Sequence, residues 1–153
     1  MKATGIVRRV DELGRLVIPK EIRRTMRLAE GTPLEIFTDR EGQIILKKYS
    51  PMMELGSFAK QYAESVAQTM NQKVAVSDRD QIIAVAGGGK RELLGKTISR
   101  QLEEMIINRE NSIQAGLDKK TIPLISGDED SYSAQAIYPI CCEGDCIGAV
   151  ILY

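Results

Sequence analysis

The first fifty residues carry the turn pattern of a complete small module in a stretch too short to bury a full core. Two turns, at residues 11–14 and 39–42, each end in glycine and separate runs of apolar, β-forming residues. Between them a short helix is predicted over residues 20–28, after Pro19 and before Gly31. The expected order is strand, turn, strand, helix, strand, turn, strand.

The size of this module predicts a partner. Fifty residues without a disulfide or a metal set bury only a modest core, and such short chains often complete it with a second subunit. The three cysteines, Cys141, Cys142 and Cys146, lie outside the module and are odd in number, which does not suggest a disulfide framework. We therefore expect residues 1–50 to form an obligate dimer.

A second segment begins where Ser50 and Pro51 break the chain. A long helix is predicted over residues 55–70, because apolar residues recur there at spacings of three and four. That stripe consists of Leu55, Phe58, Ala59, Tyr62, Ala63, Val66, Ala67 and Met70. A further helix is expected over residues 99–109, and strands are expected over residues 74–76, 82–86, 121–125, 134–140 and 147–152. This order predicts an α+β domain, an antiparallel sheet with helices on one side.

Charge separates the two segments. Residues 1–50 hold 11 Lys and Arg against 7 Asp and Glu, a net +4, and the remainder holds 10 against 14, a net −4. A polyanion would therefore meet the first segment. The sequence has no histidine, the commonest general base near neutral pH, so no catalytic activity, cofactor or metal is expected. Without a long apolar run or a signal segment, we expect a cytoplasmic protein.

Arginines dominate the positive charge of the first segment. On a helix over residues 20–28, Arg23, Arg24 and Arg27 gather opposite the apolar Ile22 and Met26. Arg8 and Arg9 lie in the first predicted strand, and Arg15 follows its turn. Planar guanidinium groups suit phosphates and guanine edges, although a solvated charged face would have the same composition.

Residues 1–24 resemble the AbrB-type swapped-hairpin regulators. The matching elements occur at the expected spacing. They are Leu13-Gly14-Arg15, Val17-Ile18-Pro19-Lys20 and Ile22-Arg23-Arg24. Further matches narrow the resemblance to the stage V sporulation protein T branch of that family. These are Gly31, the run from Pro33 to Phe37, the run from Ile44 to Pro51, and Glu54-Leu55-Gly56.

The resemblance implies a fold and a function for residues 1–50. Two chains interleave their strands into a swapped-hairpin β-barrel dimer, which binds double-stranded DNA and regulates sporulation genes as activator and repressor. Arginines that match Arg8, Arg15, Arg23 and Arg24 contact DNA in the family, by phosphate anchoring and shape readout. Arg9 and Arg27 are weaker candidates. The protein would be cytoplasmic and associated with the nucleoid.

For residues 51–153 the looser resemblance implies a GAF-like domain that joins dimers into tetramers and senses a small molecule. Relatives continue beyond the position of Tyr153, so the resemblance also implies that a closing C-terminal helix is lacking here. That helix would bear on tetramer formation and on any ligand pocket.

Three alternatives stay open beside this interpretation. The same N-terminal module serves antitoxins, in which a short tail wraps the toxin. Residues 87–97 approach a phosphate-binding loop, but five residues separate Gly89 from Gly95 where that motif has four. The cysteines around the turn at residues 143–145 could bind zinc or sense oxidation, although a fourth ligand is missing nearby.

Overall fold

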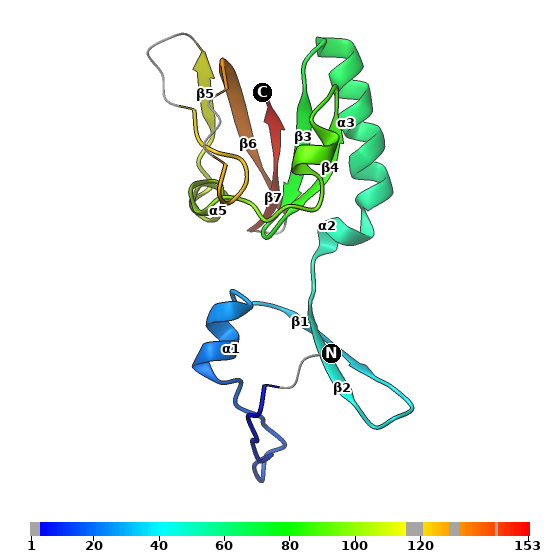
Figure 1. Cartoon of the computed structure of the whole chain (residues 1–153), viewed down its shortest axis with the longest axis vertical. Helices are drawn as coiled ribbons and strands as arrows, with labels where there is room; N and C mark the ends of the chain where they lie inside the picture. Colours follow the sequence, from blue (N-terminus) through cyan, green and yellow to red (C-terminus); the bar gives the residue numbers. More distant parts are fainter. Residues whose placement is uncertain (1–3, 116–120, 129–131, 143) are drawn as a thin grey trace. The chain divides into compact units, whose positions relative to one another are not determined.

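The chain folds into two compact units. The computed structural model describes residues 4–115, 121–128, 132–142 and 144–153 and divides the chain into Met1–Tyr49 and Ser50–Tyr153 (Figure 1). The first three residues of the matching run, and Glu143 of the cysteine turn, lie outside the described residues. Within the described part, no helix is long and apolar enough to cross a membrane.

The first unit contains one short helix and one hairpin. Helix α1 spans Lys20–Thr25, and strands β1 (Leu34–Thr38) and β2 (Ile44–Lys48) pair antiparallel. Their connecting turn is closed by Asp39, whose Oδ1 accepts hydrogen bonds from the backbone N–H groups of Glu41 and Gln43. Gly42 supplies the positive φ that this turn requires. The second predicted hairpin is therefore confirmed.

The first predicted hairpin is only partly formed. A turn is present at Asp11, but the described residues on its two sides, 4–10 and 15–19, form no strand within the chain. The expectation of two strands there is wrong for the single chain. The physical reason is that no other strand of the first unit lies beside these arms to complete their ladder.

Helix α1 ends three residues earlier than expected. Leu28 N donates to Arg23 O and Arg27 N donates to Arg24 O, which is the pair of bonds that terminates a helix in a left-handed residue. That residue is Arg27, with φ of 50°. Arg27 is therefore not helical, and its expected place on one face with Arg23 and Arg24 is wrong. Gly31 lies beyond this stop.

The second unit is a five-stranded antiparallel sheet with helices. It begins with α2 (Pro51–Glu54) and α3 (Gly56–Met70), followed by β3 (Val74–Asp78), β4 (Ile82–Ala86), α4 (Lys90–Leu93), α5 (Arg100–Asn108), β5 (Ser112–Ala115), β6 (Ala134–Cys142) and β7 (Asp145–Leu152). The order across the sheet is β4-β3-β7-β6-β5. The expected antiparallel α+β character is confirmed.

Helices cover both faces of this sheet, so the expectation of helices on one side is wrong. Helix α3 packs through Ala59, Ala63 and Ala67 on a cluster that includes Val74 and Val76 of β3. Helix α5 packs on the opposite face, where Leu102 and Ile106 belong to a second cluster (Figure 1). Alternate residues of one strand point to opposite faces, so β3 supplies Ala75 to that second cluster.

The apolar stripe of α3 divides into two strips. The alanines are buried against the sheet, and because their side chains are small, the helix can lie close to it. The larger Leu55, Phe58, Tyr62 and Met70 are exposed, and the rings of Phe58 and Tyr62 stack with centroids 6.4 Å apart. One strip therefore packs within the unit, and the other faces solvent in the single chain.

Two further expectations about the second unit need correction. Residues 121–125 form no strand, because Gln135 takes the place of a neighbouring backbone: its Oε1 accepts from Ile122 N, and its Nε2 donates to Ile122 O. Strand β5 lies at one edge of the sheet, where it pairs with β6, and the sequence analysis did not predict it. A disulfide joins Cys141 to Cys146, where the odd number of cysteines had suggested none.

Candidate nucleic-acid interface

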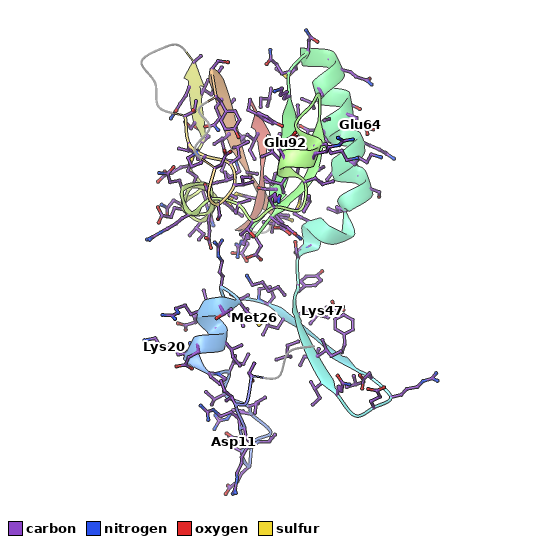
Figure 2. The ribbon with its side chains drawn as sticks, in the orientation of Figure 1. Asp11, Lys20, Met26, Lys47, Glu64 and Glu92 are labelled. Carbon is purple, nitrogen blue, oxygen red and sulfur yellow. A yellow bond between two sulfur atoms is a disulfide. The ribbon has the colours of Figure 1, made fainter. Side chains whose placement is uncertain are left out.

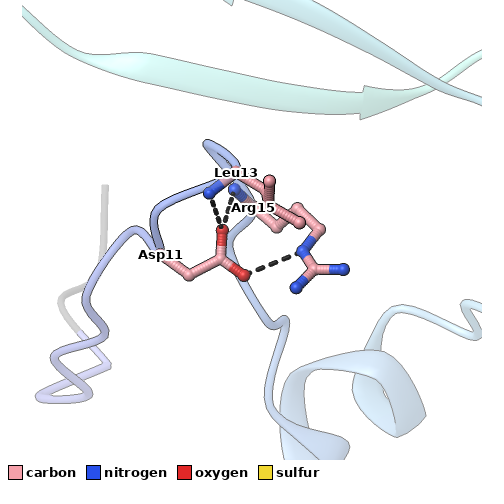
Figure 3. A network of polar contacts seen from close by, with 3 residues as sticks. All are labelled: Asp11, Leu13 and Arg15. Atoms are coloured by element: carbon pink, nitrogen blue, oxygen red, sulfur yellow. Dashed lines mark hydrogen bonds and ion pairs between the residues drawn. The ribbon is translucent and has the colours of Figure 1, made fainter.

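The turn before Arg15 is organised by one carboxylate. Asp11 Oδ1 accepts hydrogen bonds from Leu13 N at 3.0 Å and from Arg15 N at 2.8 Å, and Oδ2 forms an ion pair with Arg15 Nε at 2.8 Å (Figure 3). Gly14 N donates to Asp11 O, with a φ of 75° at Gly14. The guanidinium of Arg15 is thus held at the base of an exposed turn, opposite Asp11.

These bonds affect the ionisation of Asp11. The backbone N–H of Arg15, then its side chain, hold the pKa of Asp11 below the ordinary 3.8, since both stabilise the carboxylate. The group is fully exposed, so solvent screens the ion pair and its contribution to stability is small. Its importance is geometric, because it fixes the direction of one cationic side chain.

The same turn occurs twice in the first unit. Asp39 repeats the contacts of Asp11: its N donates to Gln43 O, as Asp11 N donates to Arg15 O, and a glycine stands at the fourth position in both. The shared pattern is Asp-x-x-Gly. The Asp39 turn closes a complete hairpin. Residues 4–19 therefore contain a hairpin turn, but the arms on its two sides are not paired within the chain.

Two candidate arginines lie on α1. Arg23 and Arg24 are both exposed, in the last turn of the helix, where a cation also interacts favourably with the helix dipole. Figure 2 marks Lys20 and Met26 at the two ends of this element. Arg27 follows in the left-handed conformation and is also exposed. Two adjacent guanidinium groups on a short helix can reach neighbouring phosphates.

The other two candidates lie in the extended arm. Arg8 and Arg9 are exposed, and Arg8 Nη1 donates to its neighbour Val7 O at 3.3 Å. The six arginines therefore belong to three segments of the first unit, namely the arm, the turn and the helix region. The sequence analysis used this turn only to separate two predicted strands and did not predict the role of Asp11. The repeated Asp-x-x-Gly pattern could have indicated it.

The glycine-rich segment of the second unit differs from a phosphate-binding loop. Residues 90–93, which interrupt the near match to a phosphate loop, form helix α4. Gly87 adopts a positive φ where a Cβ would collide with Gln72 O, which accounts for a glycine at that position. Among the described residues, no cluster of three or more His, Cys, Asp or Glu side chains could hold a metal ion.

Comparison with known proteins identifies the family. Residues 54–153 match the family model described as stage V sporulation protein T C-terminal, transcription factor. Stage V sporulation protein T of Bacillus subtilis (strain 168) is 50% identical over 153 residues, which are 100% of this chain and 85% of that protein. The chain belongs to the stage V sporulation protein T family. The expected resemblance is thereby confirmed, and the matching model describes transcription factors rather than enzymes.

The first unit has relatives of its own. Residues 7–53 match the model described as antidote-toxin recognition MazE, bacterial antitoxin. The transition state regulatory protein AbrB of Bacillus subtilis (strain 168) is 66% identical over 53 residues, 35% of this chain and 54% of that protein. The solution structure of the N-domain of the transcription factor AbrB shares 67% identity and covers 33% of this chain and 96% of its own, with a TM-score of 0.31.

The pKa of Asp11 gives a direct test of the turn. We expect a carboxyl titration followed by carbon-13 NMR to give Asp11 a midpoint below 3.8. The folded pKa lies below the unfolded one, so the stabilisation is complete above 3.8 and is lost as the pH falls through the folded pKa. Arg15→Gln should raise the midpoint toward 3.8, whereas the control Arg40→Gln should not change it. A wild-type midpoint at or above 3.8 would contradict the turn geometry.

Proposed function

We propose that this chain is a DNA-binding transcription regulator of sporulation genes, acting as activator and repressor. It would bind double-stranded DNA through an arginine-rich face of an N-terminal dimer, in the cytoplasm and associated with the nucleoid. The observation that carries the proposal is the unpaired hairpin of residues 4–19, which bears three of the six candidate arginines in a unit related to AbrB. The sporulation role rests on the relative that the whole chain matches.

Dimerisation accounts for the open hairpin arms. Val7 is 84% exposed and Val17 is 72% exposed, and other apolar side chains of the two arms are also in water. Exposed apolar side chains next to unpaired backbone groups mark a surface that another chain covers. Pairing with the same arms of a second copy would complete both ladders and bury these side chains, which is the swapped-hairpin β-barrel implied by the resemblance.

The arginines would meet DNA in that dimer. Arg8, Arg15, Arg23 and Arg24 are our assigned contacts, with Arg9 and Arg27 as secondary ones. Helix α1 has six residues and carries exposed arginines in its last turn, so it suits phosphate contacts better than insertion into the major groove. Arg15, held by Asp11, would contribute a fixed guanidinium, and the others would adapt to the shape of the duplex.

The antitoxin alternative is weaker. The match to an antitoxin model covers residues 7–53 only. An antitoxin would need a short tail that folds on a toxin, whereas residues 50–153 already fold into a sheet with a core on each face. We therefore favour the transcription regulator, with the second unit as the part that assembles dimers or responds to a signal.

Removing two arginines should weaken binding to every duplex. For Arg23→Ala with Arg24→Ala we expect lower affinity irrespective of sequence, because phosphate contacts release counterions. The dimer would lose two arginines from each chain, so the salt dependence should become shallower by up to about four units of slope. Fluorescence anisotropy with labelled genomic duplexes across a salt series measures both. The charge-matched control, Lys90→Ala with Arg91→Ala in the second unit, should leave both unchanged. Unaltered affinity in the arginine variant would remove α1 from the interface.

A single charge in the arm should break the dimer. In a monomer, Val17→Asp would be harmless, because Val17 is exposed. In the proposed dimer it buries an unpaired carboxylate, so we expect light scattering to show loss of the N-terminal dimer and anisotropy to show loss of DNA binding. Ile113→Asp, at an exposed apolar residue of the second unit, is the matched control and should retain DNA binding. A Val17→Asp protein that keeps wild-type mass and affinity would refute the swapped hairpin.

We propose an effector site in the second unit, supported by a cavity whose lining suits a small molecule. A cavity of about 620 Å³ lies at the end of the sheet. Its polar and aromatic lining consists of Asn71, Gln72, Lys73, Tyr132, Ser133 and Tyr153. The rings of Tyr132 and Tyr153 meet edge to face at 5.2 Å, and Lys73 Nζ lies 5.8 Å from the Tyr153 centroid. Burial and the charge of Glu92 raise the pKa of Tyr153 to about 12, so its hydroxyl stays protonated.

A planar molecule with a carboxylate or phosphate would suit this lining, since the rings offer stacking and Lys73 a charge. We expect aromatic carboxylates or nucleotides in a thermal-shift panel to raise the melting temperature of the wild type. The same compounds should not raise that of Lys73→Met. The control Lys96→Met, outside the cavity, should respond as the wild type does. No shift with any compound would leave the second unit as an assembly domain.

A further inference from the structure

The β6–β7 hairpin concentrates all three cysteines of the chain. Cys141 of β6 and Cys146 of β7 face each other in the strand register and form a disulfide. Cys142 is free and exposed. Neither the proposed DNA interface nor the effector cavity uses these residues, so the hairpin needs a separate explanation.

This disulfide is poorly placed to act as a structural staple. Its cysteines are five residues apart, and a cross-link stabilises least when the loop it closes is short. The backbone ladder between β6 and β7 already holds the hairpin, and it extends from Ala136 paired with Leu152 down to Cys142 paired with Asp145. The sheet therefore gains little from the bond.

The two sulfur-bearing residues differ in access. Cys141 is exposed, whereas Cys146 is only 3% exposed and belongs to the cluster beneath α5. A reagent from solution therefore reaches the sulfur of Cys141 first. Cys146 is then the buried member of the pair, protected from other reagents and held where it can re-form the bond.

Two guanidinium groups are anchored on this hairpin. Arg79 Nε donates to Cys146 O, and its Nη2 lies 3.9 Å from Asp145 Oδ1. Arg109 donates from its second Nη to Gly144 O. The thiolate is the form that reacts with peroxides and with disulfides. The hairpin thus combines an accessible sulfur, a buried partner and fixed positive charge.

The hairpin is also connected to the start of the second unit. Arg79 lies in the β3–β4 turn next to Asp78, a buried carboxylate that accepts a hydrogen bond from Ser50 Oγ at 3.2 Å. Ser50 is the first residue of the second unit, directly after Tyr49 of the first. Ile140 and Ile147, the neighbours of the bridged cysteines, pack against the cluster that contains Met52 of α2. The hairpin is therefore connected by contacts to the segment that joins the two units.

We propose that Cys141 and Cys146 form a reversible thiol–disulfide site that peroxides oxidise and low-molecular-weight thiols reduce, and that its state alters DNA affinity. The second clause rests on the proposed function. A disulfide in a protein that acts on DNA inside a reducing cell is typically transient and redox-sensing rather than structural. The site therefore belongs to the class of reversible cysteine modifications.

The oxidation balances with one peroxide. The Cys141 thiolate attacks a peroxide oxygen, the O–O bond breaks, and Cys141 becomes a sulfenic acid while hydroxide or alkoxide leaves and takes up a proton. Cys146 then attacks the Cys141 sulfur, the S–S bond forms, and the sulfenic oxygen departs as water. Two electrons pass from the two thiols to the peroxide.

The reduction uses two small thiols. A thiolate attacks the exposed sulfur of Cys141, and the Cys146 thiolate leaves. A second thiolate attacks the small-molecule sulfur of the mixed disulfide, which frees Cys141 and yields the oxidised small thiol as a disulfide. Both cysteines regain protons from water.

The chemical step is tested on the full chain in a Cys142→Ser background, which leaves only the two bridged cysteines. After hydrogen peroxide, we expect intact mass spectrometry with a thiol-alkylating label to show no label. After reduced glutathione under native conditions, followed by labelling in denaturant so that the buried Cys146 also reacts, we expect two labels, and repeated cycles should restore each state. Cys141→Ser in the same background keeps one buried thiol and should form no intramolecular bond. Failure of peroxide to form the bond, or of glutathione to open it while the fold persists, would overturn the site.

The regulatory step is measured by anisotropy with one duplex DNA in the oxidised and reduced states. We expect a several-fold difference in affinity in the Cys142→Ser background, none in the variant that also carries Cys141→Ser, and a reduced difference when Ser50→Ala removes the hydrogen bond to Asp78. Equal affinity in both states would overturn the regulatory clause. Absence of DNA binding in both states would instead overturn the proposed function, while the thiol counts would still decide the chemical site.

Discussion

Apolar side chains, among them Val7, Val10 and Val17, are exposed on two extended arms whose turn is already built. A hairpin turn without a paired ladder is unfavourable by itself, because chain entropy is lost and neither the backbone groups nor the apolar side chains gain partners. In the proposed dimer, a second chain would complete the structure of the first unit. Folding, dimerisation and the formation of the proposed arginine surface would then be one event rather than three.

The second unit is under no such constraint. Its sheet is covered by α3 on one face and by α5 on the other, and each face has its own buried cluster. A domain with a core on both sides of one sheet can form within a single chain. The exposed strip of α3, with Phe58 and Tyr62, is then free to serve assembly without being needed for folding. This difference in how the two units fold agrees with the proposed arrangement. In that arrangement the first unit would depend on a second chain, and the second unit would modulate it.

Local patterns in the sequence predicted the elements that depend on local interactions. The hairpin of β1 and β2, helix α3, and strands β3, β4, β6 and β7 all occur close to their expected positions. The errors arose where a distant residue decides the outcome. Gln135 satisfies the backbone of Ile122 and removes an expected strand, and the buried alanines of α3 face a different side of the sheet from α5. The two strands expected on either side of the Asp11 turn are absent from the single chain, and in the proposed dimer their partner would be a second copy.

The candidate site shows the same division between local and distant causes. Arginine-rich composition and helix geometry identified Arg23 and Arg24, but the helix stop at Arg27 depends on a non-glycine residue taking a left-handed conformation, which composition does not reveal. Arg15 differs from both because Asp11 fixes it, and a cation that is already oriented loses less entropy when it meets a phosphate than a mobile one does. In the proposed dimer two such turns would be present, one from each chain. The spacing between them would therefore be set by the interleaved arms, so that dimerisation itself would determine which pairs of phosphates the protein can reach.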